Sequence, residues 1–300
     1  MKPWHSSDRA LFGLYGLWIA IGLVAGTLHI DDQVVAGWPL PPFLIAFVDL
    51  CLRFGDPILI ALAAINTHSV LVRFWGRSAA RRWLLSLVAI TAVIETAGTL
   101  TGLPFGHYAY TENFGPRLSL LFIATLVILC VVAALNARDE WTVRDWLGWA
   151  AICVVIKIAI LLVSLFCNRF THLNTAALFF PVLPLAIPLA WYVLIGNALV
   201  LWRSLLPGFI VPLEAAAVAT LVTGIDWVME PFAAKLKVYW LWSDPAIPLW
   251  NYLSWWVISF LLVIFFAKSP GHQDRFDLRP PVILGTMLAL FAITRWTYGV

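Results

Sequence analysis

Charged residues are scarce in this chain: only 12% of its 300 residues are Asp, Glu, Lys or Arg, whereas 62% are hydrophobic. A soluble domain is roughly half apolar and about one-quarter charged. Runs of about 20 apolar residues recur along the chain, and each can cross a hydrocarbon core of about 30 Å as a helix. The mean hydropathy of +0.90 agrees with this pattern. We therefore predict a polytopic integral membrane protein.

Three further patterns are missing. No segment shows sustained alternation of apolar and polar residues, so strands are not expected. The net charge of +3 is small and the basic residues lie in short loops, which argues against a nucleic-acid partner. The cysteines have no C-x-x-C spacing and no nearby His pair, so we predict packing residues and no metal site. These cysteines are Cys51, Cys130, Cys153 and Cys167.

The apolar runs predict an all-α fold, a transmembrane bundle of about nine helices that forms a single membrane domain over residues 1–300. The first run follows Lys2 and Arg9 as a signal peptide would, but the segment 26–29, G-T-L-H, is a poor cleavage site, so we expect a retained helix. The predicted spans are 10–29, 43–65, 84–102, 118–135, 148–167, 178–202, 210–230, 251–267 and 282–298.

The loops indicate the orientation, because Lys and Arg favour the cytoplasmic side. With the N-terminus inside, twelve basic residues are cytoplasmic and five are not. The cytoplasmic set is Lys2, Arg9, Arg73, Arg77, Arg81, Arg82, Arg138, Arg144, Arg203, Lys268, Arg275 and Arg279, and the opposite set is Arg117, Arg169, Lys235, Lys237 and Arg295.

The first segment with unusual residues closes the third predicted span and forms the next loop. It covers residues 95–116 and reads E-T-A-G-T-L-T-G-L-P-F-G-H-Y-A-Y-T-E-N-F-G-P. Burying a charged carboxylate in a membrane is costly, so Glu95 should be partnered or protonated, as a functional acid or in a helix–helix hydrogen bond. Gly98 and Gly102 on the same helix face should let a neighbour approach closely.

The second segment covers residues 226–256 and contains D-W-V-M-E-P followed by a loop rich in tryptophan. Asp226 and Glu230 are one helical turn apart, and Pro231 should end the helix. We interpret Asp226 as a site residue and Glu230 as a solvated helix end. The tryptophans are either interfacial anchors or an aromatic wall that stabilises a cation.

Both segments lie at the non-cytoplasmic ends of predicted spans, where the sixth and eighth spans also begin. A site shared by four helices is therefore expected there. A third polar group, Asp49, Arg53 and Asp56, interrupts the second span, and an internal ion pair between Asp49 and Arg53 explains it. Lys157 stands alone in the fifth span, and neither group is assigned a role.

The motif E-x-x-G-x-x-T-G-x-P-F-G-x-Y-x-Y, followed by G-P, resembles the membrane carotenoid hydratase family. That family includes the bacterial gamma-carotene 1',2'-hydratases and the archaeal bisanhydrobacterioruberin hydratase. The match continues in I-P-L-A-W at residues 187–191 and in scattered positions as far as about residue 256. Here two predicted spans separate Pro116 from Ile187, whereas in the family pattern the two motifs are close, so residues 118–180 depart from it. The matching positions are Glu95, Gly98, Thr101, Gly102, Pro104, Phe105, Gly106, Tyr108, Tyr110, Gly115, Pro116, Ile187, Pro188, Leu189, Ala190, Trp191, Asp226, Pro231, Trp240, Trp242, Pro248, Asn251 and Trp255.

The resemblance implies a hydro-lyase that adds water to the terminal double bond of a linear or monocyclic carotenoid and needs no cofactor. Protonating that alkene gives a tertiary cation, so the site needs an acid, aromatic walls and a water held by a base. We expect Glu95 and Asp226 to divide these roles, with Glu95 favoured as the acid because it lies deeper. His107 and Tyr108 complete the catalytic candidates, and the substrate-binding candidates are Phe105, Tyr110, Trp191, Trp227, Trp240, Trp242, Asn251 and Trp255.

The expected partners are a carotenoid within the bilayer of a prokaryotic cell membrane, the membrane lipids and, as candidates, other enzymes of carotenoid biosynthesis. The chief alternative is a membrane transporter or lipid-binding protein that uses the intramembrane carboxylates. A prenyl-transferring enzyme is disfavoured because Asp-rich motifs are missing. The sequence also contains no phosphate-binding or dinucleotide-binding glycine motif.

Overall fold

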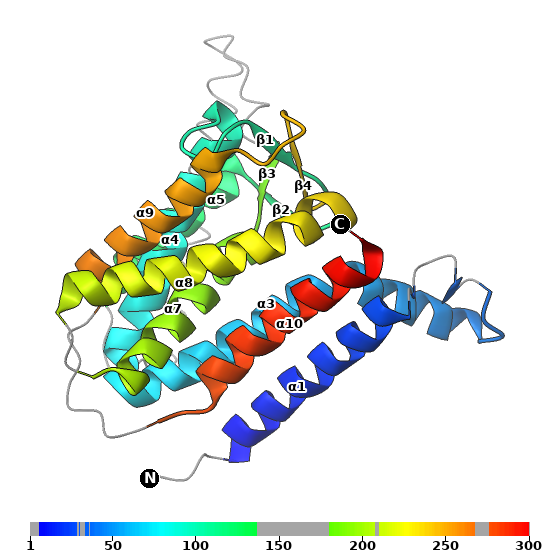
Figure 1. Ribbon diagram of the computed structural model, residues 1–300, viewed down its shortest axis with the longest axis horizontal. Helices are drawn as coiled ribbons and strands as arrows, with labels where there is room; N and C mark the ends of the chain where they lie inside the picture. The colour runs from blue at the N-terminus through cyan, green and yellow to red at the C-terminus, as the bar shows by residue number, and fades with distance from the viewer. Residues whose placement is uncertain are drawn as a thin grey trace.

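The computed structural model describes residues 6–28, 30, 34–35, 37–136, 180–207, 210–267 and 276–299. Eight α-helices make up most of these residues and form a bundle (Figure 1). They are α1 (Ser6–Thr27), α3 (Pro42–Trp75), α4 (Arg77–Thr101), α5 (Leu120–Leu135), α7 (Ala186–Leu205), α8 (Val211–Pro231), α9 (Leu249–Phe266) and α10 (Arg279–Tyr298). A π-helical turn, η2 (Phe232–Leu236), directly continues α8. The prediction of an all-helical fold is confirmed.

Six helical segments in the described residues are long and apolar enough to cross a membrane: α1, α4, α7, α8 with η2, α9 and α10. Helix α5 has only 16 residues, and α3 carries three charged residues in its first half. These helices fit an integral membrane protein. The expected count of nine spans is not confirmed, and both the span at 148–167 and Lys157 lie outside the described residues.

The sequence predicted no strands, but the described residues contain four short ones within the all-α fold. Strand β1 (Tyr108–Tyr110) pairs antiparallel with β4 (Trp240–Trp242), and β2 (Arg117–Ser119) pairs antiparallel with β3 (Pro181–Pro184). Segment 181–184 was predicted as the start of a helix, but its two prolines lack backbone N–H groups and favour extended backbone in the residue before them. Helix α7 therefore begins at Ala186.

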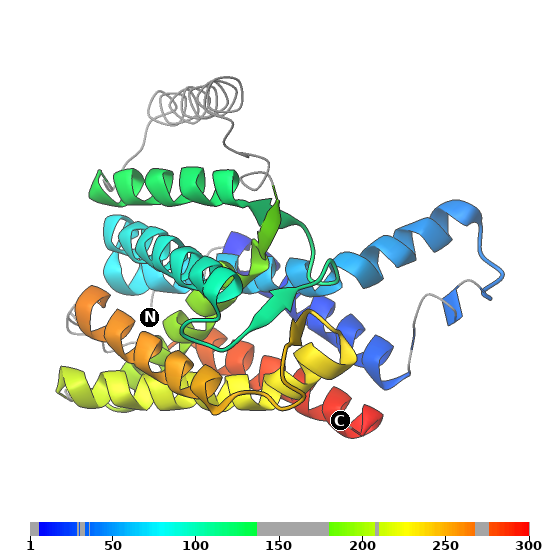
Figure 2. The same cartoon turned by 90° about the horizontal axis from the view of Figure 1, so that it is seen from above.

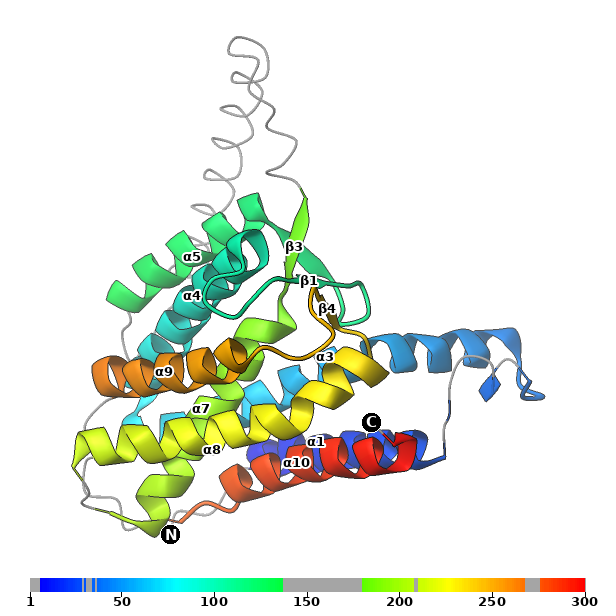
Figure 3. The same ribbon diagram turned by 45° about the horizontal axis from the view of Figure 1, so that its top comes forward.

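Helix α7 is the central element, in contact with α3, α4, α8 and α10. Its sequence is apolar on all sides, as expected for a helix surrounded by protein, and Trp191, Tyr192 and Val193 are fully buried. Helix α8 lies between α9 and α10, and the strands gather at one end of the bundle (Figure 3). The loops that hold the two predicted site segments therefore meet at that end.

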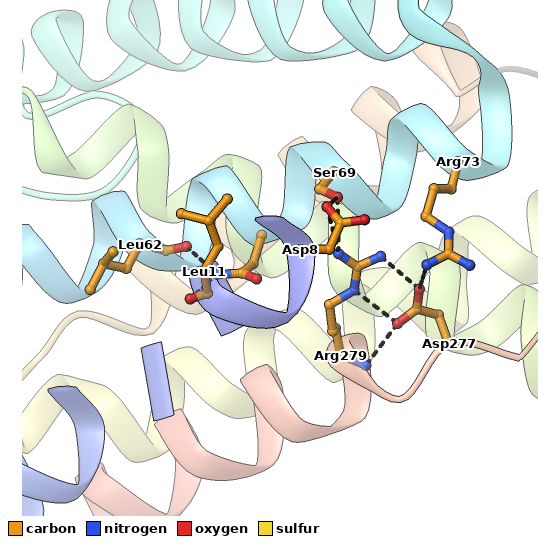
Figure 4. A network of polar contacts seen from close by, with 8 residues as sticks. Asp8, Leu11, Leu62, Ser69, Arg73, Asp277 and Arg279 are labelled. Atoms are coloured by element: carbon orange, nitrogen blue, oxygen red, sulfur yellow. Dashed lines mark hydrogen bonds and ion pairs between the residues drawn. The ribbon is translucent and has the colours of Figure 1, made fainter. Parts of the chain in front are cut away.

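Buried ion pairs join the helices at the opposite end. Arg279 at the start of α10 is fully buried, donates to both carboxylate oxygens of Asp277 at 3.0 and 2.8 Å, and also bonds Ser69 of α3 (Figure 4). Ser69 in turn donates to Asp8 of α1 at 2.6 Å. Partners of this kind satisfy charges that water cannot reach, so the cluster ties α1, α3 and α10 together.

Helix α3 is longer than the predicted span 43–65. Its 34 residues at 1.5 Å per residue extend over about 51 Å. Its first half projects beyond the other helices (Figure 2). The expected ion pair between Asp49 and Arg53 is confirmed at 3.5 Å, with Arg53 mostly exposed. Asp56 belongs to a different group of contacts, nearer the bundle.

Candidate functional site

Glu95 lies near the C-terminal end of α4 and is buried. Helix α4 ends where Gly102 adopts a left-handed conformation (φ 77°), and the loop then folds back over the helix. Tyr108 and Tyr110 each donate a hydrogen bond to Oε2 of Glu95 at 2.7 Å, and Trp191 Nε1 donates to Oε1 at 2.7 Å. Both carboxylate oxygens are thus occupied by donors.

Gly98 makes this arrangement possible, because a Cβ atom there would lie 2.7 Å from the Phe105 ring and 2.9 Å from the Tyr108 hydroxyl. The sequence correctly predicts a close approach at this glycine. The approaching group, however, is the loop that follows α4, and not a second helix. The glycine therefore seats the donor tyrosine directly above Glu95.

Asp226 and Glu230 lie one turn apart on α8, and both are buried. Trp240 and Trp242 donate their indole N–H groups to Oε1 of Glu230 at 2.9 and 2.6 Å. Glu230 is therefore not the solvated helix end that the sequence suggested. Helix α8 ends at Pro231 as expected, but the π-helical turn and β4 bring the chain back over Glu230.

Asp226 has the poorest set of donors of the three carboxylates. Its Oδ2 accepts one hydrogen bond from Asn251 Nδ2 at 3.3 Å, and its Oδ1 has no partner among the described residues. A buried polar atom without a partner is unusual and often marks a functional group.

The three carboxylates line one cavity, which is otherwise apolar and aromatic. The space open to the centre of a water molecule is about 70 Å³, enough for more than one water molecule. Its walls come from α3, α4, α7, α8, α9, α10 and the loops that carry β1 and β4. The lining side chains are Asp56, Leu59, Ile60, Glu95, Phe105, Tyr108, Tyr110, Phe114, Ile187, Ala190, Leu194, Asp226, Met229, Glu230, Phe232, Tyr239, Trp240, Trp242, Asn251, Trp255, Met287, Leu290 and Phe291.

Ring contacts hold the aromatic side of the cavity in place. Trp191 stacks on Trp255 with ring centroids 3.6 Å apart, and Tyr108 contacts Trp242 at 5.1 Å. Burial, and next the negative charge of Glu95, raises the pKa of Tyr108 and Tyr110 well above the usual value. Both hydroxyls therefore remain neutral donors in the ordinary pH range.

The structure brings most of the predicted site residues together. Nine of them line the cavity, and Trp191 lies directly behind it on Glu95. The nine are Glu95, Phe105, Tyr108, Tyr110, Asp226, Trp240, Trp242, Asn251 and Trp255. The expectation of a site shared by four helices is met by α4, α7, α8 and α9, and α3 and α10 also contribute.

Two predicted residues lie elsewhere. His107 is exposed, because residues 108 and 110 of the extended segment point inward and their neighbours therefore point outward. Its ring packs over Gly102. Trp227 follows Asp226 on α8, is 58% exposed, and has the Arg295 guanidinium 5.9 Å from its ring. Neither side chain lines the cavity.

Glu230, Asp56 and Tyr239 also line the cavity, and none of the three was among the predicted site residues. The i and i+4 spacing of Asp226 and Glu230 was a usable signal, since it puts both side chains on one helix face. The alternation in Y-A-Y and W-L-W was another, because it predicts short strands with their aromatic rings on one side.

Within the described ranges, no group of three or more His, Cys, Asp or Glu residues is arranged to hold a metal ion. Of the cysteines, Cys51 and Cys130 fall within these ranges and both are free thiols. The carboxylates of the cavity are held by tyrosine, tryptophan and asparagine donors. The site is therefore a set of separately hydrogen-bonded acids in an aromatic enclosure.

A bundle of apolar, membrane-length helices with buried acids and aromatic rings in one cavity defines an integral membrane protein with an internal polar site. The chain belongs to the carotenoid biosynthesis protein family, whose model matches residues 55–164 and 118–298. The prediction of the family is confirmed, and the protein has a role in carotenoid biosynthesis. No curated protein and no solved structure matches the chain.

The two matched segments overlap within the stretch where the sequence departs from the family pattern. The fold closes this gap, because β2 pairs with β3 and Leu185 N lies 3.5 Å from the Pro116 carbonyl oxygen. The G-P and I-P-L-A-W motifs are thus neighbours in space.

Proposed function

We propose that the protein is a hydro-lyase that adds water across the terminal double bond of a carotenoid and gives a tertiary alcohol. The observation that carries this proposal is a buried carboxyl oxygen without a partner, Asp226 Oδ1, in a cavity walled by tryptophan and tyrosine. Proton delivery to an alkene needs a strong acid that is shielded from water. The cation that forms needs aromatic ring faces beside it.

Asp226 is the proposed general acid. Both oxygens of Glu95 accept hydrogen bonds, which favour its charged form, whereas Oδ1 of Asp226 has no partner among the described residues. Burial does not separate the two acids, because Glu95 is 3% exposed and Asp226 is 0% exposed. The sequence favoured Glu95 as the acid, whereas the hydrogen bonds of the two carboxyl groups favour Asp226.

Glu230 is the proposed base that holds the attacking water. Both indoles bond its Oε1, and Oε2 has no hydrogen bond from the described residues. In the reaction, the Asp226 proton bonds to one alkene carbon and leaves a tertiary cation. The water oxygen then attacks that cation, and its extra proton passes to Glu230. Transfer of a proton from Glu230 to Asp226, its neighbour one turn away, restores the site.

Glu95 is proposed to act as a fixed negative charge. It is held in place by two hydroxyls and one indole, and its field favours a cation in the cavity. Stacked Trp191 and Trp255 and the tilted Tyr108 and Trp242 give the same region ring faces, which attract a cation without reacting with it. A carotenoid partitions into the bilayer, so only its end needs to reach this cavity.

Expression in a host that produces linear carotenoids tests the proposal. Each hydrated end should add the mass of one water molecule, and isotopically labelled water should supply the oxygen atom. The pigments are separated by chromatography and weighed by mass spectrometry. Incorporation of oxygen from O₂, in the presence of a reductant, would assign the protein to the hydroxylases instead.

A further inference from the structure

A second, open cavity lies beside the first, at the end of the bundle that carries the strands. By the same measure its volume is about 1000 Å³. Charged side chains on it include Arg53, Glu112, Arg117 and Lys237. We call this cavity the vestibule. Its size and polarity fit a space that bulk water fills.

Two residues, Asp56 of α3 and Tyr239 of the loop after η2, line both the vestibule and the inner cavity. The Tyr239 hydroxyl donates a hydrogen bond to Asp56 Oδ2, and Lys237 Nζ lies 3.4 Å from the same oxygen. Phe114 stacks on the Tyr239 ring at 4.2 Å. This pair is therefore the partition between the two spaces.

The backbone around this partition is held in an unusual conformation. Val238 has φ 51°, which a β-branched residue adopts only at a cost in free energy. Thr111 and Asn113 donate side-chain hydrogen bonds to the carbonyl oxygen of Val238 and so hold it there. As a result, Lys237 and Tyr239 both reach Asp56. Strain that surrounding contacts maintain often marks a functional position.

We propose that the Asp56–Tyr239 pair is the passage through which water moves from the vestibule to the inner cavity. The need for such a passage rests on the proposed hydration, which consumes one water molecule per turnover. A purely apolar partition would keep water out, whereas a carboxylate and a hydroxyl exchange hydrogen bonds with a passing molecule. Burial, and next the charge of Asp56, raises the pKa of Tyr239 well above its usual value, so the hydroxyl stays neutral.

Thiol labelling tests the passage without any turnover. In a background without its four cysteines, Leu290→Cys reports from the inner cavity, and a charged, membrane-impermeant thiol reagent is added to sealed vesicles. Tyr239→Ala removes the ring that separates the two spaces and should raise the labelling rate at position 290 several-fold. Tyr239→Phe removes only the hydroxyl, and because the reagent is larger than water and reports the width of the opening, its rate should change little. Asp56→Ala is the second variant, with the same expected direction as Tyr239→Ala.

Three further cysteines serve as controls. Asn113→Cys on the vestibule and Leu206→Cys at the other end of the bundle identify the two faces of the vesicle, and Val93→Cys on the outer surface of α4 checks the fold. Position 290 should be labelled from the same face as position 113. The proposal is overturned if Tyr239→Ala and Asp56→Ala leave the rate at position 290 unchanged, or if labelling comes from the face of position 206. Neither result depends on whether the protein hydrates a carotenoid.

Discussion

The three carboxylates of the cavity differ in the number of donors around them, and this difference is what separates their roles. Glu95 accepts three hydrogen bonds, Glu230 accepts two, and Asp226 accepts one long bond from Asn251. A carboxylate with several donors is stable as an anion, while one with few donors is better suited to hold and release a proton. Replacing Asp226 or Glu95 should therefore reduce product in both cases but have different effects on stability.

Asp226→Asn should abolish most product while leaving stability unchanged or slightly higher. The amide cannot deliver a proton, and loss of general acid catalysis typically costs about 10² to 10⁴ in rate. Stability should hold because Oδ1 has no partner to lose. The measurements are pigment formed per amount of membrane protein and thermal unfolding in detergent. Asp244→Asn in an exposed loop is the control, and normal turnover by Asp226→Asn would reject the assignment.

Glu95→Gln should reduce both stability and product. The amide nitrogen of the new side chain would replace one carboxylate oxygen and face a donor, either Trp191 Nε1 or the two tyrosine hydroxyls. A buried donor without an acceptor costs about 1–3 kcal/mol. Thermal unfolding should therefore move to lower temperature in this variant but not in Asp226→Asn. Equal melting temperatures for the two variants would contradict the difference in their hydrogen bonding.

At the scale of elements, the site depends on the fit between α4 and the loop that folds back over it. Gly98→Ala should lower both stability and product formation, because the new methyl group would push Phe105 and Tyr108 away from Glu95. Overpacking of this kind costs about 1–3 kcal/mol. Gly224→Ala on α8 is the matched control, since a Cβ there meets nothing within 4 Å. Similar melting temperatures and activities for the two variants would contradict the close packing.

The ion pairs at the far end of the bundle give a second prediction about elements. Arg279→Met should destabilise the protein by about 3–5 kcal/mol, because Asp277 would keep a buried charge without its main partner. Arg53→Met removes a mostly exposed pair with Asp49 and should cost at most about 1 kcal/mol. Thermal unfolding in detergent compares the two. An equal, small effect would show that the contacts around Arg279 do not secure α10.

At the scale of the whole molecule, the two ends of the bundle differ. The site, the strands and the vestibule occupy one end, while Arg73, Arg77, Arg81 and Arg203 lie toward the other. Because basic residues favour the cytoplasmic side, a reporter inserted near Asn113 should be non-cytoplasmic and one inserted near Leu206 should be cytoplasmic. Reporter activity in intact cells measures this, and a cytoplasmic Asn113 would invert the proposed orientation of the site.

The sequence by itself determined the class of protein, the helical fold and nine of the residues that line the cavity. Long apolar runs indicate helices that span a membrane, and the motif that begins at Glu95 is long enough to identify the family. The sequence also placed Glu95 and Asp226 at one end of the bundle, because successive spans alternate in direction and α4 and α8 therefore end on the same side.

Only the tertiary structure decided which side chains are buried and which of them hydrogen-bond to one another. Whether a side chain near a helix end faces protein or lipid depends on the packing of neighbouring elements, so Glu230 became buried under two indoles while Trp227 turned outward. Hydrogen bonds between segments about 100 residues apart, such as Trp191 to Glu95, leave no local pattern. The unpartnered oxygen of Asp226 and the shared position of Asp56 and Tyr239 follow from that packing, and no spacing in the chain could reveal them.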